Sequence, residues 1–200
     1  MLSFHIVLRF RCMTGIILLA GMSKRMGENK LLLPYEGKTI CEHTLTTLLE
    51  CFSSVIAITG YERERIEEIL CKYPGVEVAF NERFEEGQKT SIQKGLEAAS
   101  DDVAIVPGDL PLLRATDIRK GIPSLAGYPS VRAYHHESPG HPVFIRKELV
   151  PFLLSTEKSI FDALREKETA RYQAGIGTVF DIDTPERYKA LLDGDVSIHD

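Results

Sequence analysis

The fold is decided by residues 15–30, which read Gly15-Ile16-Ile17-Leu18-Leu19-Ala20-Gly21-Met22-Ser23-Lys24-Arg25-Met26-Gly27-Glu28-Asn29-Lys30. The apolar first half is typical of a strand buried on both faces of a parallel sheet. In the second half, Gly21 and Gly27 would let backbone N–H groups approach phosphate oxygens, and Lys24, Arg25 and Lys30 would supply the countercharge. The stretch therefore predicts a buried strand that runs into a phosphate-binding loop.

This loop differs from the two commonest glycine-rich phosphate motifs. A P-loop needs Lys and Ser/Thr directly after its second glycine, whereas Glu28 and Asn29 follow Gly27. The dinucleotide fingerprint needs a second glycine two residues after the first, and Ser23 stands there. An ordinary charged turn between strand and helix would explain the glycines, but it leaves three cations around one turn unexplained.

Composition limits the classes of protein to consider. The chain has 200 residues, of which 44% are hydrophobic and 26% charged, which fits one globular α/β domain. Its net charge of −5 and evenly mixed charges argue against a nucleic-acid partner. No apolar stretch approaches the roughly 18 residues that cross a bilayer. The single cysteines at 12, 41, 51 and 71 are typical of reduced thiols, so we expect a cytoplasmic protein that does not span a membrane.

Short apolar runs alternate with amphipathic ones along the chain. This alternation predicts a single α/β, Rossmann-like three-layer domain, with a mainly parallel sheet and helices on both faces. We expect this domain to occupy residues 13–200, after a disordered or non-native N-terminal extension at residues 1–12. The expected strands are 15–20, 54–59, 76–80, 103–107, 130–134 and 142–146, and the expected helices are 39–51, 62–72, 88–99, 115–121, 147–154, 158–167 and 185–192.

The stretch 123–142 breaks this alternation with four prolines. We expect a flexible or substrate-facing excursion there. It ends in Gly140-His141-Pro142, where a histidine stands at the mouth of a new strand. A lone histidine is more often a hydrogen-bonded or surface residue than a catalyst. The nearby His135 and His136 lack the ligand spacing of a transition-metal site.

Two further segments carry carboxylates. In Val106-Pro107-Gly108-Asp109-Leu110-Pro111 a buried strand ends by presenting one carboxylate, which suits Mg²⁺, since Mg²⁺ binds one or two carboxylates plus substrate phosphates. The alternative is that Asp109 only caps the turn before Thr116. In Asp181-Ile182-Asp183-Thr184-Pro185, capping explains Thr184 and Pro185, while alternation places Asp181 and Asp183 on one face of an extended segment. One of these two could complete the metal site.

A last segment, Glu86-Gly87-Gln88-Lys89-Thr90-Ser91, leads into a helix. A glycine and hydroxyls at a helix N-terminus can bind an anion or read a base edge. Plain N-capping is an equally good explanation.

Taken in order, these segments resemble the MobA-like nucleotidyltransferases, and in particular the branch of molybdenum cofactor cytidylyltransferases. The first loop matches the family's Leu-Ala-Ala-Gly-x-Ser-x-Arg-Met-Gly-x-x-Lys from Ala20 to Lys30 and departs from it at Leu19. Gly87-Gln88-Lys89-Thr90-Ser91 is similar to the branch's Gly-Met-x-x-Ser, with Gln88 in place of methionine. The segments at 106–111, 140–143 and 181–186 are similar to its remaining signatures.

The resemblance implies transfer of CMP, from CTP, to the terminal phosphate of molybdopterin. It implies Arg25, Lys30 and Asp109 as catalytic residues, Mg²⁺ on Asp109 and Asp183, and a molybdenum hydroxylase as a transient client. Open alternatives are GTP or another NTP as donor; a sugar phosphate, an isoprenoid precursor or phospholactate as acceptor; or a non-catalytic protein that delivers the cofactor. The residues implied in binding are Leu18, Ala20, Gly21, Ser23, Lys24, Gly27, Ser91 and Gly108 for the nucleotide, and His141 and Pro142 for the acceptor.

Overall fold

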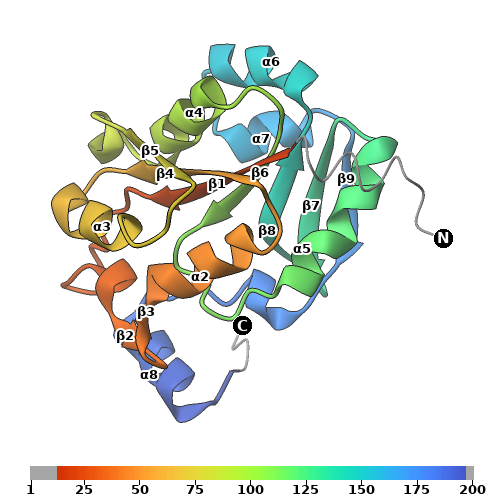
Figure 1. The fold of residues 1–200 in the computed structure, drawn as a ribbon. Coiled ribbons are helices and arrows are strands. Elements are labelled where there is room, and N and C mark those ends of the chain that lie inside the picture. Colours follow the sequence, from red (N-terminus) through yellow and green to blue (C-terminus); the bar gives the residue numbers. More distant parts are fainter. Residues whose placement is uncertain (1–12, 197–200) are drawn as a thin grey trace.

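A seven-stranded sheet in the order β5-β4-β1-β6-β8-β7-β9 forms the centre of the molecule (Figure 1). The computed structural model describes residues 13–196, so the expectation for residues 1–12 lies outside the described residues. Within that range β8 runs antiparallel to β6 and β7, and the other neighbouring strands are parallel. The strands are β1 (Met13–Leu19), β4 (Ser54–Thr59), β5 (Val76–Phe80), β6 (Asp102–Pro107), β7 (Ser130–His135), β8 (Ser138–Ile145) and β9 (Thr169–Gln173).

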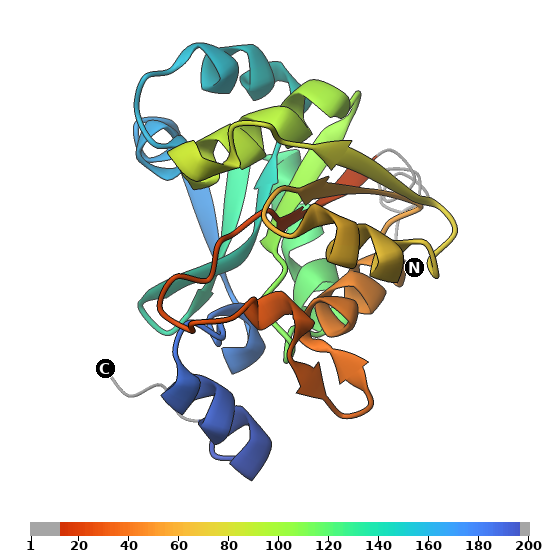
Figure 2. The same ribbon diagram turned by 90° about the vertical axis from the view of Figure 1, so that its left-hand side faces the viewer.

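Helices cover both faces of this sheet, which confirms the predicted three-layer fold (Figure 2). One face packs against α2 (Ile40–Leu49), α3 (Arg63–Leu70) and α5 (Ala115–Gly121), and the other against α4 (Gln88–Ala98), α6 (Val150–Ser155) and α7 (Ile160–Arg165). No helix between residues 13 and 196 has the length and apolar character to cross a bilayer. The short 3₁₀ helices are η1 (Lys30–Leu32), η2 (Phe84–Glu86), η3 (Ile122–Ala126), η4 (Lys147–Leu149) and η5 (Ile176–Thr178).

Strand β1 shows why the opening stretch is apolar throughout. All seven of its residues are buried. Because successive side chains of a strand point to opposite faces, Ile17 and Leu19 join the core under α2 and α5, while Ile16 and Leu18 join the core under α4 and α6. A strand with two buried faces has no place for polar alternation.

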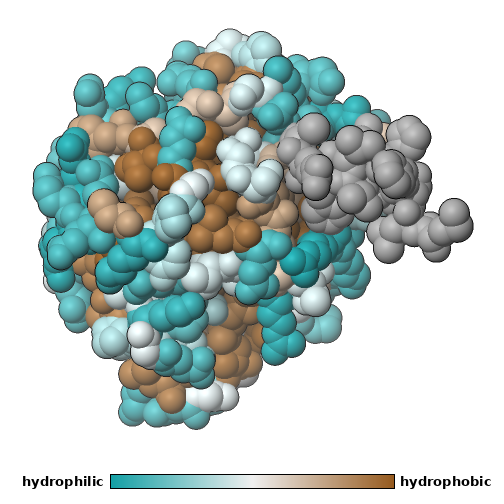
Figure 3. Space-filling model, viewed as in Figure 1, coloured by the Kyte–Doolittle hydropathy of each residue, from teal (hydrophilic) through white to brown (hydrophobic). Residues whose placement is uncertain are grey.

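A third, smaller core ties the C-terminal segment to the region after β1. Leu33 and Ile40 pack there with Phe180, Ile182 and Leu191. Leu191 lies in α8 (Pro185–Asp193), beside a hairpin of β2 (Pro34–Tyr35) and β3 (Lys38–Thr39). In the view of Figure 3, the surface is mostly hydrophilic, with hydrophobic patches over the middle strands and toward α8 and the β2–β3 hairpin. This packing brings the 181–186 segment to the loop that follows β1.

The stretch 123–142 differs most from expectation. It is not a flexible excursion but η3 followed by the β7–β8 hairpin, whose turn holds His136 at φ 52°. The β8 strand begins at Ser138 rather than 142. Only Val143–Ile145 pairs with β6, which lets prolines, lacking an N–H, stand in the first half of the strand. The sequence analysis also missed β9 and the β2–β3 hairpin, because each is too short or too polar to show a strand pattern.

Candidate active site

The loop after β1 closes on itself and carries Lys30 back to the end of the strand. Ser23 at φ 49° and Gly27 at φ 75° adopt left-handed backbone, the conformation that glycine tolerates best. The Met26 N–H donates to the Ser23 carbonyl at 2.9 Å, and the Lys30 N–H donates to Ser23 Oγ at 3.2 Å. The Ser23 hydroxyl thus shapes the loop. Asn29 then caps η1 by accepting from the Leu31 N–H at 3.2 Å.

Lys30 lies between two carboxylates that the sequence places far apart. Its ammonium contacts both Asp109, two residues past the end of β6, and Asp183, two residues before α8. Arg25 reaches the other oxygen of Asp183 at 2.5 Å. The Lys30 and Asp109 side chains are only 14% and 10% exposed, whereas Arg25 is 69% exposed. The site therefore combines a shielded cation, Lys30, with a solvent-exposed one, Arg25, and both pair with Asp183.

The charges of this cluster shift one another's pKa values. Burial alone would lower the pKa of Lys30, but Asp109 and Asp183 outweigh it and hold the pKa above its ordinary value. Burial would raise the pKa of Asp183, and the hydrogen bonds and charges of Lys30 and Arg25 lower it. The pKa of Asp181 is raised, by burial and by the neighbouring Asp109 and Asp183. Lys30 and Asp183 are therefore both charged at neutral pH.

Backbone contacts fix the position of Asp109. The Gly108 N–H donates to the Leu18 carbonyl at 3.0 Å, and a Cβ on Gly108 would lie 2.3 Å from Leu19 Cδ2, so any other residue would have to displace the Leu19 side chain. The Ile182 N–H donates to the Asp109 carbonyl at 3.1 Å and docks the 181–183 segment here. Because the Asp109 side chain turns toward Lys30, the alternative that it caps the turn before α5 is wrong.

A pocket of about 220 Å³ opens beside this cluster. Its walls come from the ends of β1 and β6, from η1, and from the start of α4. Seven residues predicted for the site line it, while Ser23, Lys24, Arg25 and Gly27 lie outside its lining. The predicted residues in the wall are Leu18, Ala20, Gly21, Lys30, Ser91, Gly108 and Asp109, and those not predicted are Met22, Leu31, Phe84, Gly87, Gln88 and Pro107.

The start of α4 forms one wall of this pocket. Gly87 stands before the helix at φ 109°, and Thr90 Oγ1 donates to its carbonyl at 2.9 Å. Ser91 is buried and accepts from the Asn81 side-chain amide at 3.0 Å. A helix N-terminus that faces a pocket presents unpaired N–H groups and partial positive charge. Asn81 was missed because nothing in the sequence near it marks a site.

His141 does not line the pocket but lies on β8, the strand beside β6. Its Nδ1 is 3.3 Å from the Ile105 carbonyl oxygen, and its ring meets Phe161 edge-on at 5.6 Å. Burial, with the nearby charge of Arg132, lowers the pKa of His141, so the imidazole is neutral at pH 7. Pro142 is buried. The role of both residues toward an acceptor stays a prediction.

Comparison with known proteins decides the family. A model of the MobA-like NTP transferase domain matches residues 15–170 of the chain. The chain belongs to the MobA-like family. It is accordingly a nucleotidyltransferase, as predicted, and the match spans the loop after β1, Asp109 and His141.

Among MobA-like relatives, the Escherichia coli molybdenum cofactor cytidylyltransferase is 31% identical over 133 residues, covering 66% of this chain and 69% of that protein. A probable molybdenum cofactor guanylyltransferase of Bacillus cereus is 30% identical over 176 residues, covering 80% and 83%. The Mycobacterium tuberculosis protein Rv0371c, solved in complex with manganese, superposes with a TM-score of 0.78 at 20% identity over 91% of this chain and 98% of that one. The last likeness shows the fold alone.

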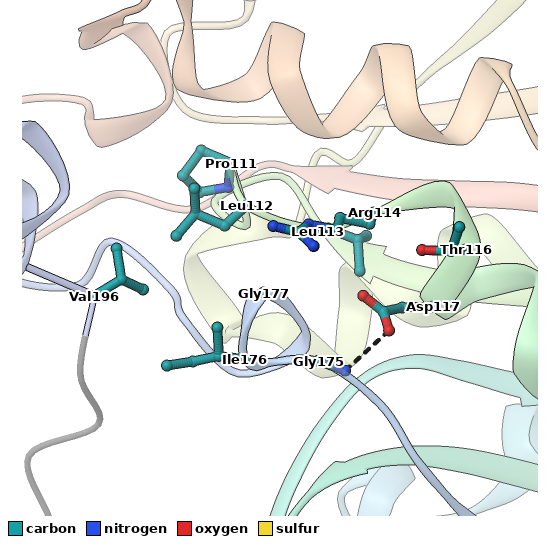
Figure 4. A pocket seen from close by; sticks show the side chains of 10 residues that line it. All are labelled: Pro111, Leu112, Leu113, Arg114, Thr116, Asp117, Gly175, Ile176, Gly177 and Val196. Carbon is teal, nitrogen blue, oxygen red and sulfur yellow. Dashed lines mark hydrogen bonds between the residues drawn. The ribbon is translucent and has the colours of Figure 1, made fainter. Parts of the chain in front are cut away.

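A larger pocket, of about 550 Å³, is lined by none of the residues of the charged cluster (Figure 4). Leu112, Ile176 and Val196 line it together with Arg114 and Asp117. Asp117 faces Gly175 and accepts from its N–H at 2.9 Å. That carboxylate is engaged in a loop contact and no predicted site residue lines the cavity, so the smaller pocket beside Lys30 is the candidate active site.

Proposed function

We propose that the chain transfers CMP from CTP to the terminal phosphate of molybdopterin and releases pyrophosphate. The observation that carries this proposal is the Lys30 ammonium, which lies between Asp109 and Asp183 and lines a pocket with three glycines in its wall. The cytidylyltransferase name of the Escherichia coli relative supports the donor, and the names of both relatives support the acceptor.

The chemistry that this site must perform is modest. An oxygen of the acceptor phosphate attacks the α-phosphorus of CTP, and the bond from that phosphorus to the leaving pyrophosphate breaks. The attacking phosphate is already ionised, so no general base is needed and catalysis reduces to positioning and charge stabilisation. Lys30 and the exposed Arg25 would neutralise charge on the α-phosphate and on pyrophosphate. The backbone N–H groups around Gly21 would hold the remaining phosphates.

Asp109 and Asp183 are suited to hold Mg²⁺. Within residues 13–196, Asp109 Oδ1 is buried without a hydrogen-bond partner, and such an orphaned hard oxygen fits a divalent cation. No group of three His, Cys, Asp or Glu side chains in that range forms a complete metal site, so substrate phosphates would supply the other ligands. When bound, the ion would neutralise phosphate charge.

The finished dinucleotide cofactor would pass to a molybdenum hydroxylase in the cytoplasm. The free thiols of Cys41, Cys51 and Cys71 are consistent with that reducing compartment. Surface contacts with such a client would be transient, because each cofactor molecule has to be released once it is delivered.

Pyrophosphate release from CTP, GTP, ATP and UTP tests the proposal, with Mg²⁺ and molybdenum-loaded molybdopterin as acceptor. We expect release with CTP and not with the other three nucleotides, because a site that pairs one base edge rejects other bases strongly. Reactions without acceptor control for simple hydrolysis. Release with GTP alone would instead make the chain a guanylyltransferase. Tight CTP binding with no release from any nucleotide would contradict transfer to molybdopterin and favour another acceptor or a delivery role.

A further inference from the structure

A second charged pocket lies under α7, against β7 and β9. It has a volume of about 130 Å³, and its charged lining residues are Arg132, Arg165 and Arg171. Among the described residues that line it, none is acidic. A water molecule occupies about 30 Å³ in the liquid, so the space is large enough for one small oxyanion. The charge of this pocket is of one sign only.

Arg132 is the innermost of these cations. Its Nε donates to the Gly140 carbonyl at 3.1 Å, and its guanidinium lies 4.7 Å from the centre of the Phe161 ring. A guanidinium has five N–H donors, and within residues 13–196 no carboxylate pairs with this one. A partly buried charge is costly unless it is compensated. Most donors of Arg132 therefore remain available to a ligand.

Arg171 adds a second charge on the same side. It is the register partner of Arg132 on the neighbouring parallel strand, so both side chains project from one face of the sheet. Arg171 stacks over Tyr134, 4.5 Å from the ring centre. Arg165 differs, since it pairs with Asp162 at 3.1 Å. Like charges side by side destabilise a sheet, so an anion between Arg132 and Arg171 would relieve an unfavourable contact.

We propose that this pocket binds a tetrahedral oxyanion of the phosphate type, held by Arg132 and Arg171. Arginine forks bind oxyanions through paired N–H donors, and the aromatic walls hold both guanidinium planes in place. The pocket adjoins the predicted acceptor side of the active site, because Phe161 contacts Arg132 on one side and His141 on the other. The oxyanion is either a free ion from solution or a second anionic group of the acceptor. The second of these sources rests on the proposed function.

Titration with inorganic phosphate at constant ionic strength tests the site itself. The cations near Lys30 also attract phosphate, so the measurement must distinguish the two regions. The side-chain Nε–H NMR signal of Arg132 does so, because it reports on this pocket directly. We expect this signal to shift with phosphate in the wild type. Arg171→Gln should weaken the phosphate affinity read from this titration about tenfold, because one charge-assisted contact is lost. Arg65→Gln on the distant α3 serves as a matched control. An Arg132 signal that phosphate leaves unmoved would overturn the proposal.

A second set of variants separates binding from a structural role. Calorimetric titration of Lys30→Ala, with and without Arg132→Gln, isolates the pocket from the active-site cations. We expect Arg132→Gln to lose about tenfold in phosphate affinity and Arg132→Lys to recover part of it, since the charge remains but the fork is lost. Equal affinity in all of these variants would overturn the site. If Arg132→Gln does not fold, the Arg171→Gln titration decides alone.

Steady-state kinetics then identify the source of the oxyanion. If the acceptor carries it, Arg132→Gln raises the KM for the acceptor about tenfold while the KM for CTP is unchanged, and phosphate competes with the acceptor. If free oxyanion is the ligand, phosphate binding falls and the acceptor KM stays the same. A wild type without turnover would refute the proposed function only, because the titrations do not depend on catalysis.

Discussion

The active site and the pocket under α7 use positive charge differently. Lys30 lies between Asp109 and Asp183, so its charge is balanced in the protein alone. Arg132 and Arg171 lie side by side in a pocket whose described lining contains no acid. A balanced cluster stabilises its own geometry before substrate arrives, whereas an unbalanced one has its favourable partner in a ligand. The difference is consistent with the two proposals, preorganised catalysis at the first region and anion binding at the second.

The largest effect should come from removing the buried carboxylate of the balanced cluster. We expect Asp109→Ala to lower kcat about 10³-fold, since this position would hold the metal that the phosphates need. The thermal midpoint should change little, because Lys30 keeps Asp183 as a partner. Pyrophosphate release and a melting curve measure both, with the exposed Asp101→Ala as control. A normal rate in Asp109→Ala would remove Asp109 from the catalytic residues.

The next effect tests whether the balanced cation acts in catalysis rather than in binding. We expect Lys30→Ala to lower kcat about 10²-fold and to weaken CTP binding far less, because charge on the leaving pyrophosphate develops only in the transition state. Single-turnover rates and equilibrium titration separate the two quantities. Lys38→Ala, an exposed lysine on β3, is the control. An effect confined to CTP affinity would show that Lys30 only binds.

A smaller effect is expected at His141, whose neighbour Phe161 also contacts Arg132 of the pocket under α7. We expect His141→Ala to raise the acceptor KM about tenfold and to spare CTP binding. Because the pKa of His141 is lowered, the ring stays neutral, and the acceptor KM should show no titration of this residue between pH 6 and 8. His43→Ala is matched, since that imidazole also contacts a backbone carbonyl, at 2.8 Å. Weakened CTP binding would move His141 to the donor side.

The smallest effect concerns stability and pH. The folded pKa of Asp183 lies below its ordinary value of 3.8, so its charge stabilises the fold above the unfolded pKa and this contribution is lost as pH falls through the folded pKa. We expect Asp183→Asn to reduce the free energy of unfolding by at most about 1 kcal/mol at pH 7. The difference from wild type should shrink below pH 4 in urea titrations. A difference that grows there would contradict the sign.

Most of the fold could be predicted because strand and helix periods are written locally in the chain. The expected strands at 54–59 and 76–80 match β4 and β5 residue for residue, and the other expected strands overlap β1, β6, β7 and β8. Where turn chemistry and prolines obscured the period, the prediction was incomplete: within 123–142 it included the strand at 130–134 but missed η3 and the first half of β8. The loop cations and Asp109 could be found because a glycine turn and a carboxylate at a strand end are local signals too.

From the amino-acid sequence came the two-sided burial of β1, the glycines and cations of the loop after it, and the family. Tertiary structure alone decided that Lys30 meets Asp183, 153 residues further along the chain, and that Arg132 lies beside Arg171. Both pairings depend on the order of strands in the sheet and on the docking of the 181–183 segment through the Ile182 N–H. Side-chain periodicity reports which face a residue occupies, but through-space partners are set by which strands pack next to each other.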